Sequence, residues 1–300
     1  MHSPIPKRLI QTGKLPQSLR TRAMVSNLRL LHSDYEYLFF DDAGVEKFID
    51  QEFSQYRSVF DGFRFAIQRY DFFRYLAIYR YGGFYFDLDV LLASDVSALL
   101  EFGCVFPFEG LTFSHFLRTQ CNMDWEIGNY AFGAYAGHPF LEAVIENCVR
   151  AQKDPEWVKP TLRGLPPLSK WEFYILYSSG PGLLSRTLAE NPQLAKTVKV
   201  LFPEDVCDGN NWNRFGDFGV HLMDATWRLN KSRLRRRLAL EWEAWQLRKL
   251  IRESSLQGKT REHHYSSGEE NSLDHPGRIR SANRARTTNA MPESLLVPKG

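Results

Sequence analysis

Two aspartates one residue apart, Asp87 and Asp89, interrupt the apolar, β-type run of residues 84–92. An ionised carboxylate inside a sheet is costly unless a cation meets it, and alternation along a strand puts these two side chains on the same side. Such a pair suits a hard divalent cation, Mn²⁺ or Mg²⁺, whose open positions phosphate oxygens fill. The predicted chemistry is departure of a nucleoside diphosphate, since the cation neutralises charge on the leaving group. The alternative is a solvated strand end, because this spacing is common by chance.

The segment before the aspartates indicates how they are positioned. Residues 65–81 are apolar almost all round, which predicts a helix buried on most of its faces. Gly82 and Gly83 end this helix and permit a sharp return into the strand, because glycine tolerates left-handed backbone conformations. Asp71 and Arg74 lie three residues apart on one helix face. They form either an internal ion pair or a pair that reaches the nucleotide, and both readings stay open.

The rest of the chain supplies the elements of an α/β sheet. Strands are expected at residues 5–12, 35–40, 198–202 and 219–222, and helices at 43–60, 140–150 and from 183 onward. A strand, helix, strand order at the start favours an α/β fold. Residues 151–170 indicate a surface insertion. Residues 228–253, with nine Lys/Arg against three Glu, predict a basic helix, and residues 258–300 predict a disordered tail.

Composition excludes several classes of protein. The 300 residues carry a formal charge of only +3, which does not indicate a nucleic-acid binder. The four cysteines lie far apart without the spacing of a zinc site, so we expect buried small hydrophobic residues. No run of about twenty apolar residues is present, and residues 1–17 lack the apolar stretch of a signal peptide. We therefore expect one catalytic domain with appendages, soluble or peripheral as written.

Residues 67–75 followed by 82–89 resemble the signature of the DXD-containing sugar-binding glycosyltransferases. That family includes polymannose-initiating and inositol-phosphorylceramide mannosyltransferases and is remotely similar to the catalytic domains of large glucosylating toxins. The likeness continues, in the family's order, through residues 5–12, 129–141, 179–181 and 220–227. The sequence departs from the family pattern at Ile10, where many members carry His, at Gly13, where many carry Trp, and at Thr226, which replaces the usual Ser.

The resemblance implies a GT-A type fold, an α/β domain with a Rossmann-like mixed central sheet and flanking helices. It implies a catalytic domain at residues 1–228, a basic C-terminal helix at 229–257 and a disordered tail at 258–300. Asp89 is expected as the main metal ligand, Asp87 as a contact to the ribose and the metal shell, and His221 as a third ligand, with a structural role as its alternative. The residues expected to be catalytic are Asp87, Asp89 and Arg74. The residues expected to bind the donor are Gln11, Thr12, Asp71, Arg74, Gly83, Asp87, Asn129 and Trp227, the last as a lid.

The implied activity is retaining transfer of a hexose from a UDP- or GDP-sugar to a glycan or glycolipid acceptor, with Mn²⁺ or Mg²⁺. The alternatives are a non-catalytic relative that binds a glycan or a partner, and a nucleotide-sugar hydrolase with water as acceptor. The basic helix at residues 228–253 either contacts an anionic membrane or packs on the domain. No nucleic-acid partner is expected. The expected location is cytoplasmic or membrane-peripheral, or the Golgi lumen if an anchor has been removed.

Overall fold

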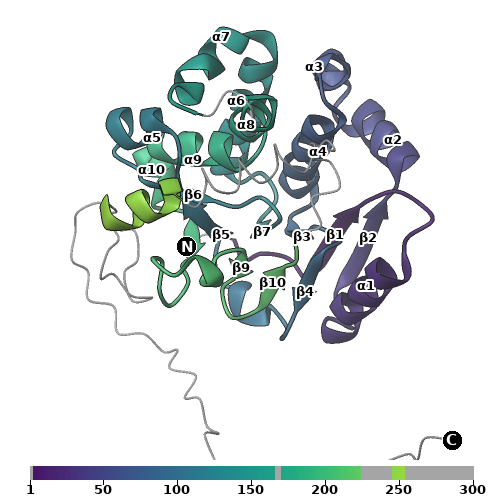
Figure 1. The fold of residues 1–300 in the computed structure, drawn as a ribbon. Coiled ribbons are helices and arrows are strands. Elements are labelled where there is room, and N and C mark those ends of the chain that lie inside the picture. The colour runs from purple at the N-terminus through teal and green to yellow at the C-terminus, as the bar shows by residue number, and fades with distance from the viewer. Residues whose placement is uncertain (1–2, 166–169, 224–244, 254–300) are drawn as a thin grey trace, which may run out of the picture. The chain divides into compact units, whose positions relative to one another are not determined.

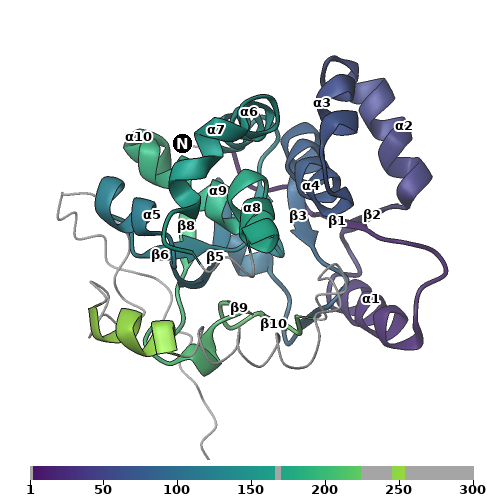
Figure 2. The same ribbon diagram turned by 45° about the horizontal axis from the view of Figure 1, so that its top comes forward.

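The computed structural model describes residues 3–165, 170–223 and 245–253, drawn in colour in Figures 1 and 2. All of them belong to one of the two units into which the chain divides, residues 1–267. None of the helices in these described ranges has the length and apolarity to cross a membrane. Trp227, the predicted tail and most of the predicted basic helix lie outside the described residues, so the predicted division of the chain at 228 and 257 stays a prediction.

A mixed sheet forms the centre of the fold (Figure 1). Its strand order is β2-β1-β3-β7-β5-β6, with β8 beside β5. Neighbours β1 and β2, β1 and β3, and β5 and β8 are parallel, whereas β7 is antiparallel to β3 and β5, and β6 to β5. The strand bounds are β1 Arg8–Thr12, β2 Glu36–Phe40, β3 Gly83–Phe86, β5 Cys104–Leu111, β6 Trp125–Ile127, β7 Ala131–Ala134 and β8 Lys199–Leu201.

Helices cover one face of this sheet, and a helix with a second sheet covers the other (Figure 1). Alternation along β3 serves both layers: Tyr85 packs in the core cluster under the helices, while Phe84 and Phe86 pack in the cluster of the opposite layer. The first layer holds α2 Asp42–Glu52, α3 Arg57–Gly62, α4 Ala66–Tyr81, α6 Pro139–Lys153, α7 Pro155–Val158, α8 Lys170–Ser178 and α9 Pro181–Glu190. The second holds α1 Leu19–Leu31 and strands β4 Val90–Leu92, β9 Arg214–Phe215 and β10 Gly219–His221.

Shorter elements between residues 3 and 223 are α5 His115–Gln120, α10 Pro192–Ala195 and 3-10 turns at Ser54–Tyr56, Ser97–Leu99, Lys159–Leu162 and Gly209–Asn211. Residues 245–253 are also helical. The expected α/β fold, with a mixed central sheet and flanking helices, is confirmed by these layers.

The turn from α4 into β3 depends on its two glycines. Gly82 has a φ of +66° and donates its N–H to the carbonyl of Ile78 at 2.8 Å. Gly83 has a φ of +111°, and a Cβ there would lie 2.5 Å from the carbonyl oxygen of Arg8. A side chain at either position would strain the backbone. The glycines therefore end α4 and let the chain return sharply into β3, as predicted, and β3 lies between β1 and β7.

Two predictions about helices and loops were wrong. The expected helix at residues 43–60 is broken at Phe53, whose φ of −140° leaves the helical region and separates α2 from α3. The expected surface insertion at 151–170 contains α7 and a 3-10 turn, and within its described part Trp157, Val158 and Thr161 are buried. These side chains fill space beside α6, so the segment is part of the core.

Candidate active site

The ends of several strands meet at one edge of the sheet. Strands β1 and β3 are parallel and end at Thr12 and Phe86, and β5 runs the same way because both it and β3 are antiparallel to β7. Thr12, Asp87 and Glu109 therefore lie at this carboxyl edge, and Asn129 joins them because it precedes β7. These four residues line a cavity of about 340 Å³. The carboxyl edge of such a sheet is where α/β proteins commonly bind ligands.

The sequence predicted that both aspartates lie within one strand, and this prediction was wrong because they lie in a turn. β3 ends at Phe86, Asp87 donates its N–H to the carbonyl of Tyr130 at 2.7 Å, and Val90 donates to the carbonyl of Asp87 at 3.1 Å. The chain then leaves the central sheet, because β4 pairs with β10 instead of continuing beside β1 and β7. The turn, and not strand alternation, brings the carboxylates together.

Asp87, Asp89 and His221 form a potential metal site. Each offers one ligand atom, and these atoms all lie within 4.8 Å of one another. The antiparallel pairing of β10 with β4 places His221 opposite Val90, so that His221 Nε2 lies 3.2 Å from Asp89 Oδ1. The His221 ring also stacks on Tyr130, with 4.4 Å between ring centroids. Two carboxylates and an imidazole fit a divalent cation, and the nitrogen donor favours Mn²⁺ over Mg²⁺, which prefers oxygen ligands.

Electrostatics around His221 are consistent with its place beside two acids. Burial lowers the pKa of His221, but the hydrogen bond to Asp89 and the charges of Asp87, Asp89 and Glu109 outweigh burial and raise the pKa above its ordinary value. The negative charges that hold a proton on the ring would also hold a cation at the same place.

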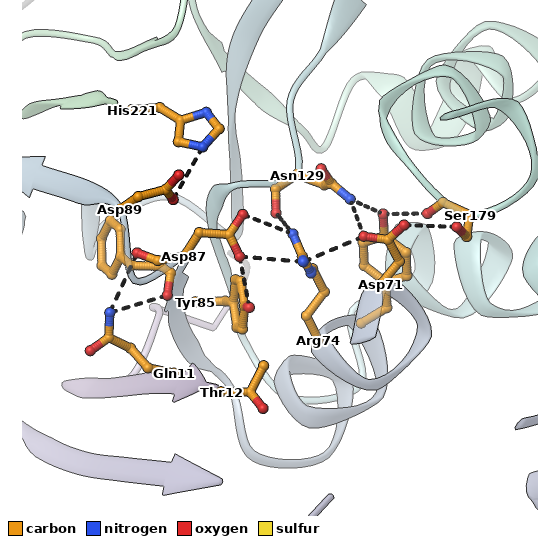
Figure 3. A network of polar contacts seen from close by, with 12 residues as sticks. Gln11, Thr12, Asp71, Arg74, Tyr85, Asp87, Asp89, Asn129, Ser179 and His221 are labelled. Atoms are coloured by element: carbon orange, nitrogen blue, oxygen red, sulfur yellow. Dashed lines mark hydrogen bonds and ion pairs between the residues drawn. The ribbon is translucent and has the colours of Figure 1, made fainter. Parts of the chain in front are cut away.

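Arg74 connects the metal site to the buried part of the cavity (Figure 3). Its side chain is only 5% exposed, and it lies 3.3 Å from both carboxylate oxygens of Asp87 and 3.4 Å from Asp71 Oδ1. Arg74 Nη1 also donates to the carbonyl of Asn129 at 2.8 Å, and the guanidinium lies 4.8 Å from the centre of the Tyr85 ring. Burial alone would lower the pKa of Arg74, but Asp87, Tyr85 and Asp71 raise it, so the side chain is a fixed cation.

Asp71 is buried and accepts hydrogen bonds from two further segments. Asn129 Nδ2 donates to Asp71 Oδ1 at 2.9 Å, and Ser179 Oγ donates to Asp71 Oδ2 at 2.7 Å (Figure 3). Tyr75 also donates, from its hydroxyl to the carbonyl of Ser179 at 2.8 Å. Burial raises the pKa of Asp71, opposed by Arg74, Ser179 and Asn129. The network fixes α4, the segment before β7 and the loop before α9 relative to one another.

Other residues predicted to bind the donor lie at different depths. Thr12 lines the cavity, although its hydroxyl donates to the carbonyl of Phe40 at 2.8 Å. Gln11 is 3% exposed, donates to the carbonyl of Phe86 at 3.2 Å and accepts from the Tyr37 hydroxyl. Gln11 thus holds the end of β3 from behind the cavity, while Gly83 lies at the opposite end of β3 and acts through the backbone turn.

A second cavity of about 680 Å³ adjoins the first and shares Thr12, Arg74 and Asp87 with it. Its remaining walls include the aromatic side chains of Phe65 and Trp171. The site therefore has a polar chamber beside the aspartates and a more aromatic chamber on the other side of Arg74 and Asp87.

Glu109 was not among the residues predicted for the site. Its strand β5 has a register irregularity between Phe108 and Gly110, and such bulges redirect side chains. Glu109 lines the polar chamber, and a Cβ on Gly128 would collide with Glu109 Oε2. The signal was present, since Glu109 interrupts an apolar run just as Asp87 does.

The predicted basic helix is described only at residues 245–253, which are helical. There Leu250 is buried in the main core cluster and Glu253 lies 3.8 Å from Arg118 of α5. This part packs on the domain, as one of the two alternatives for this segment predicted.

Part of the chain matches one protein-family model, and several known proteins are similar to it. Residues 18–105 match the model of the "Glycosyltransferase sugar-binding region containing DXD motif". Inositol phosphoceramide mannosyltransferase 3 of Schizosaccharomyces pombe is 30% identical over 155 residues, 52% of this chain and 36% of that protein. Inositol phosphoceramide mannosyltransferase 2 of the same yeast is 28% identical over 209 residues, 64% of this chain and 53% of that protein. The chain thus spans about half or less of the length of these relatives.

Three solved structures, each titled a glycosyltransferase, align with this chain at TM-scores below 0.5. The PaToxG glycosyltransferase aligns with a TM-score of 0.42 and 18% identity, covering 65% of this chain and 75% of that one. The UDP-bound glycosyltransferase domain of the YGT toxin aligns with a TM-score of 0.41 and 10% identity, covering 86% and 92%. The galactosyltransferase LgtC aligns with a TM-score of 0.37 and 10% identity, covering 83% and 96%.

Proposed function

We propose, on the premise that residues 18–105 belong to the DXD-containing glycosyltransferase sugar-binding family, that this chain transfers a hexose from a nucleotide-diphosphate sugar to a glycan or glycolipid acceptor. We further propose that the reaction retains the configuration of the donor and uses a divalent cation held by Asp87, Asp89 and His221. The observation that carries the proposal is the position of Arg74, a buried cation between Asp71 and Asp87. Asp87 in turn lies beside Asp89 and His221.

The cation supplies charge neutralisation for the departing nucleoside diphosphate when it is bound. The protein's own groups do the rest. Arg74 is held by Asp71 and Asn129, so its guanidinium cannot turn away from the cavity, and such preorganised charge stabilises a developing anion without reorganisation. Asp87 is fixed by Arg74 and by the Tyr85 hydroxyl, which donates to Asp87 Oδ1 at 2.9 Å.

The two chambers suit the two halves of the donor. The aromatic walls of Phe65 and Trp171 favour a nucleoside base, since aromatic side chains stack on bases. The polar chamber holds Asp71, Glu109 and Asn129, whose oxygen and nitrogen atoms suit the hydroxyl groups of a sugar. Arg74 and Asp87 lie where the chambers join, which is where the diphosphate between base and sugar would lie.

The acceptor is proposed from the relatives. Two of them are named as inositol phosphoceramide mannosyltransferases, so a mannose donor and a glycolipid acceptor are the first pair to test.

The test is release of nucleoside diphosphate from a panel of UDP- and GDP-sugars, with Mn²⁺, with Mg²⁺ and with chelator. Asp89→Asn removes one metal ligand, and Asp50→Asn, on the exposed surface of α2, is the matched control. We expect nucleoside diphosphate to be released from one donor, and this release should require the cation. The rate of release should fall by a factor of at least about 100 in Asp89→Asn and stay unchanged in Asp50→Asn. A glycolipid acceptor should become glycosylated in the same reaction, with the anomeric configuration determined by NMR.

Two outcomes would contradict the proposal. Donor cleavage that yields only free sugar, whichever acceptor is offered, would identify a nucleotide-sugar hydrolase. Folded protein with Mn²⁺ that neither binds nor cleaves any donor would identify a non-catalytic relative.

A further inference from the structure

Exposed apolar side chains concentrate beside the mouth of the site. Among the described residues six large apolar side chains are exposed. Five of them lie in or next to three elements: in α1 and just before it, in β4, and just after β10. On α1 itself Leu19 and Leu30 are 81% and 79% exposed. The six exposed side chains are those of Leu15, Leu19, Leu30, Leu91, Met223 and Trp245.

The exposed leucines of α1 and β4 lie on the outside of one core cluster. Leu19 and Leu30 are eleven residues apart, which is close to three turns, so they share one face of α1. Leu28 on the opposite face of α1 packs in the same core cluster as Val90 and Leu92, between which Leu91 points outward. α1 also lies beside β4 (Figure 1). The three leucines therefore face away from one shared core.

Positive charge surrounds these leucines. α1 contains Arg20, Arg22 and Arg29 and no acidic residue, and all three arginines are exposed. Arg214 of β9 is also exposed. It lies in the same row of the three-stranded sheet as Leu91, because both residues pair with Val220 of β10. Leucines that enter the acyl boundary, ringed by arginines that meet phosphate groups, form the pattern of an interfacial helix on anionic lipid.

We propose that this surface, the outer face of α1 together with Leu91 of β4, docks on an anionic lipid membrane. We call it the α1 surface. Thr21, on the opposite face of α1, and Met223 line the polar chamber, so docking would hold the site close to the lipid, with α1 between them. Membrane binding by the α1 surface does not depend on the proposed function. The idea that it brings a lipid-linked acceptor to the chamber rests on that function.

The test is co-sedimentation of the full chain with phosphatidylcholine vesicles, with and without phosphatidylserine. We expect binding only to vesicles with phosphatidylserine, and weaker binding at high salt. The double variant Leu19→Gln, Leu30→Gln should lower the partition coefficient by about tenfold for each leucine. Arg22→Gln should lower it by about fivefold. Trp245→Gln is the matched control, because Trp245 is 54% exposed but lies in the basic segment outside the α1 surface, and it should bind like the parent.

Several results would overturn the inference: no binding of the parent chain to either vesicle, equal binding by the double leucine variant, or loss of binding in Trp245→Gln alone. Circular dichroism of each variant verifies folding, which substitution at such exposed positions should leave unchanged. Donor cleavage without vesicles separates this inference from the proposed function. Retained cleavage with lost vesicle binding supports the α1 surface, whereas vesicle binding by a chain that cleaves no donor refutes only the proposed function.

Discussion

Arg74 and Asp71 form a buried ion pair, with 5% of each side chain exposed and 3.4 Å between Nη2 and Oδ1. Arg74→Gln removes the cation shared by Asp71 and Asp87, and breaking a buried pair in this way costs about 3–5 kcal/mol. Asp71→Asn leaves Arg74 with Asp87 as its acidic partner in this network and puts an amide among donors, which costs about 3 kcal/mol. The double variant leaves neither charge of the pair uncompensated. We therefore expect it to cost about 2 kcal/mol less than the sum of the single variants.

The measurement is the free energy of unfolding of the four forms by urea titration at neutral pH. Arg57 and Asp61 provide a matched cycle, because their side chains are 34% and 51% exposed and such pairs couple by less than about 1 kcal/mol. If the effects of Arg74→Gln and Asp71→Asn add within about 0.5 kcal/mol, Arg74 does not compensate Asp71 and the account of the site as a charge network fails.

Three further predictions concern the turn, the polar chamber and pH. Gly83→Ala should destabilise the fold by about 3 kcal/mol, since Gly83 has a positive φ and no room for a Cβ. Gly164→Ala is the control: its φ is +81° but a Cβ there would meet open space, so it should cost about 1 kcal/mol. Both costs are measured by denaturant titration, and equal costs would contradict the steric argument. Glu109→Gln should slow transfer by about 10- to 100-fold without changing the melting temperature or the calorimetric affinity for nucleoside diphosphate, because we expect Glu109 to hydrogen-bond a sugar or acceptor hydroxyl; an unchanged rate would exclude this role. The pKa of His221 is raised in the folded protein, so with the metal removed by chelator its protonation stabilises the fold at pH values below its ordinary pKa of 6.5. This stabilisation is lost as the pH rises through the folded-state pKa. Melting temperatures measured against pH should show the loss in the parent and not in His221→Gln.

The helix before the aspartates was predictable because its signals are local and strong. The all-round apolar run at residues 65–81 corresponds to α4, Ala66–Tyr81, and the two glycines end it where expected. Strands β2, β8 and β10 likewise lie within the segments predicted for them, since each is short, apolar and bounded by turn residues. Of the two readings left open for Asp71 and Arg74, the ion pair is confirmed. Both side chains also line the cavity, and their contact with a nucleotide stays a prediction.

Features set by distant segments were not predictable. β5 was missed because Pro107 and Gly110 obscure the pattern of this strand and a bulge interrupts its register. The aspartates were assigned to one continuous strand because alternation along residues 84–92 is consistent with it. The chain turns at Asp87 because β4 pairs with β10, which lies far along the sequence. The residues around β4 carry no pattern that identifies a pairing strand so far away in the sequence.

The charge balance explains why these acids can lie together. Asp71, Asp87 and Asp89 are joined through Arg74 and His221 in one network. When His221 is neutral, one guanidinium faces three carboxylates, which leaves two negative charges in a partly buried place. A proton on His221 removes one of them, consistent with the raised pKa of its ring, whereas a divalent cation removes both. Because a metal ligand must be deprotonated, proton and cation compete at His221. Glu109, whose charge also raises the pKa of His221, adds to the negative charge that favours the cation. The same acids that destabilise the metal-free site are therefore what would give it affinity for a divalent cation.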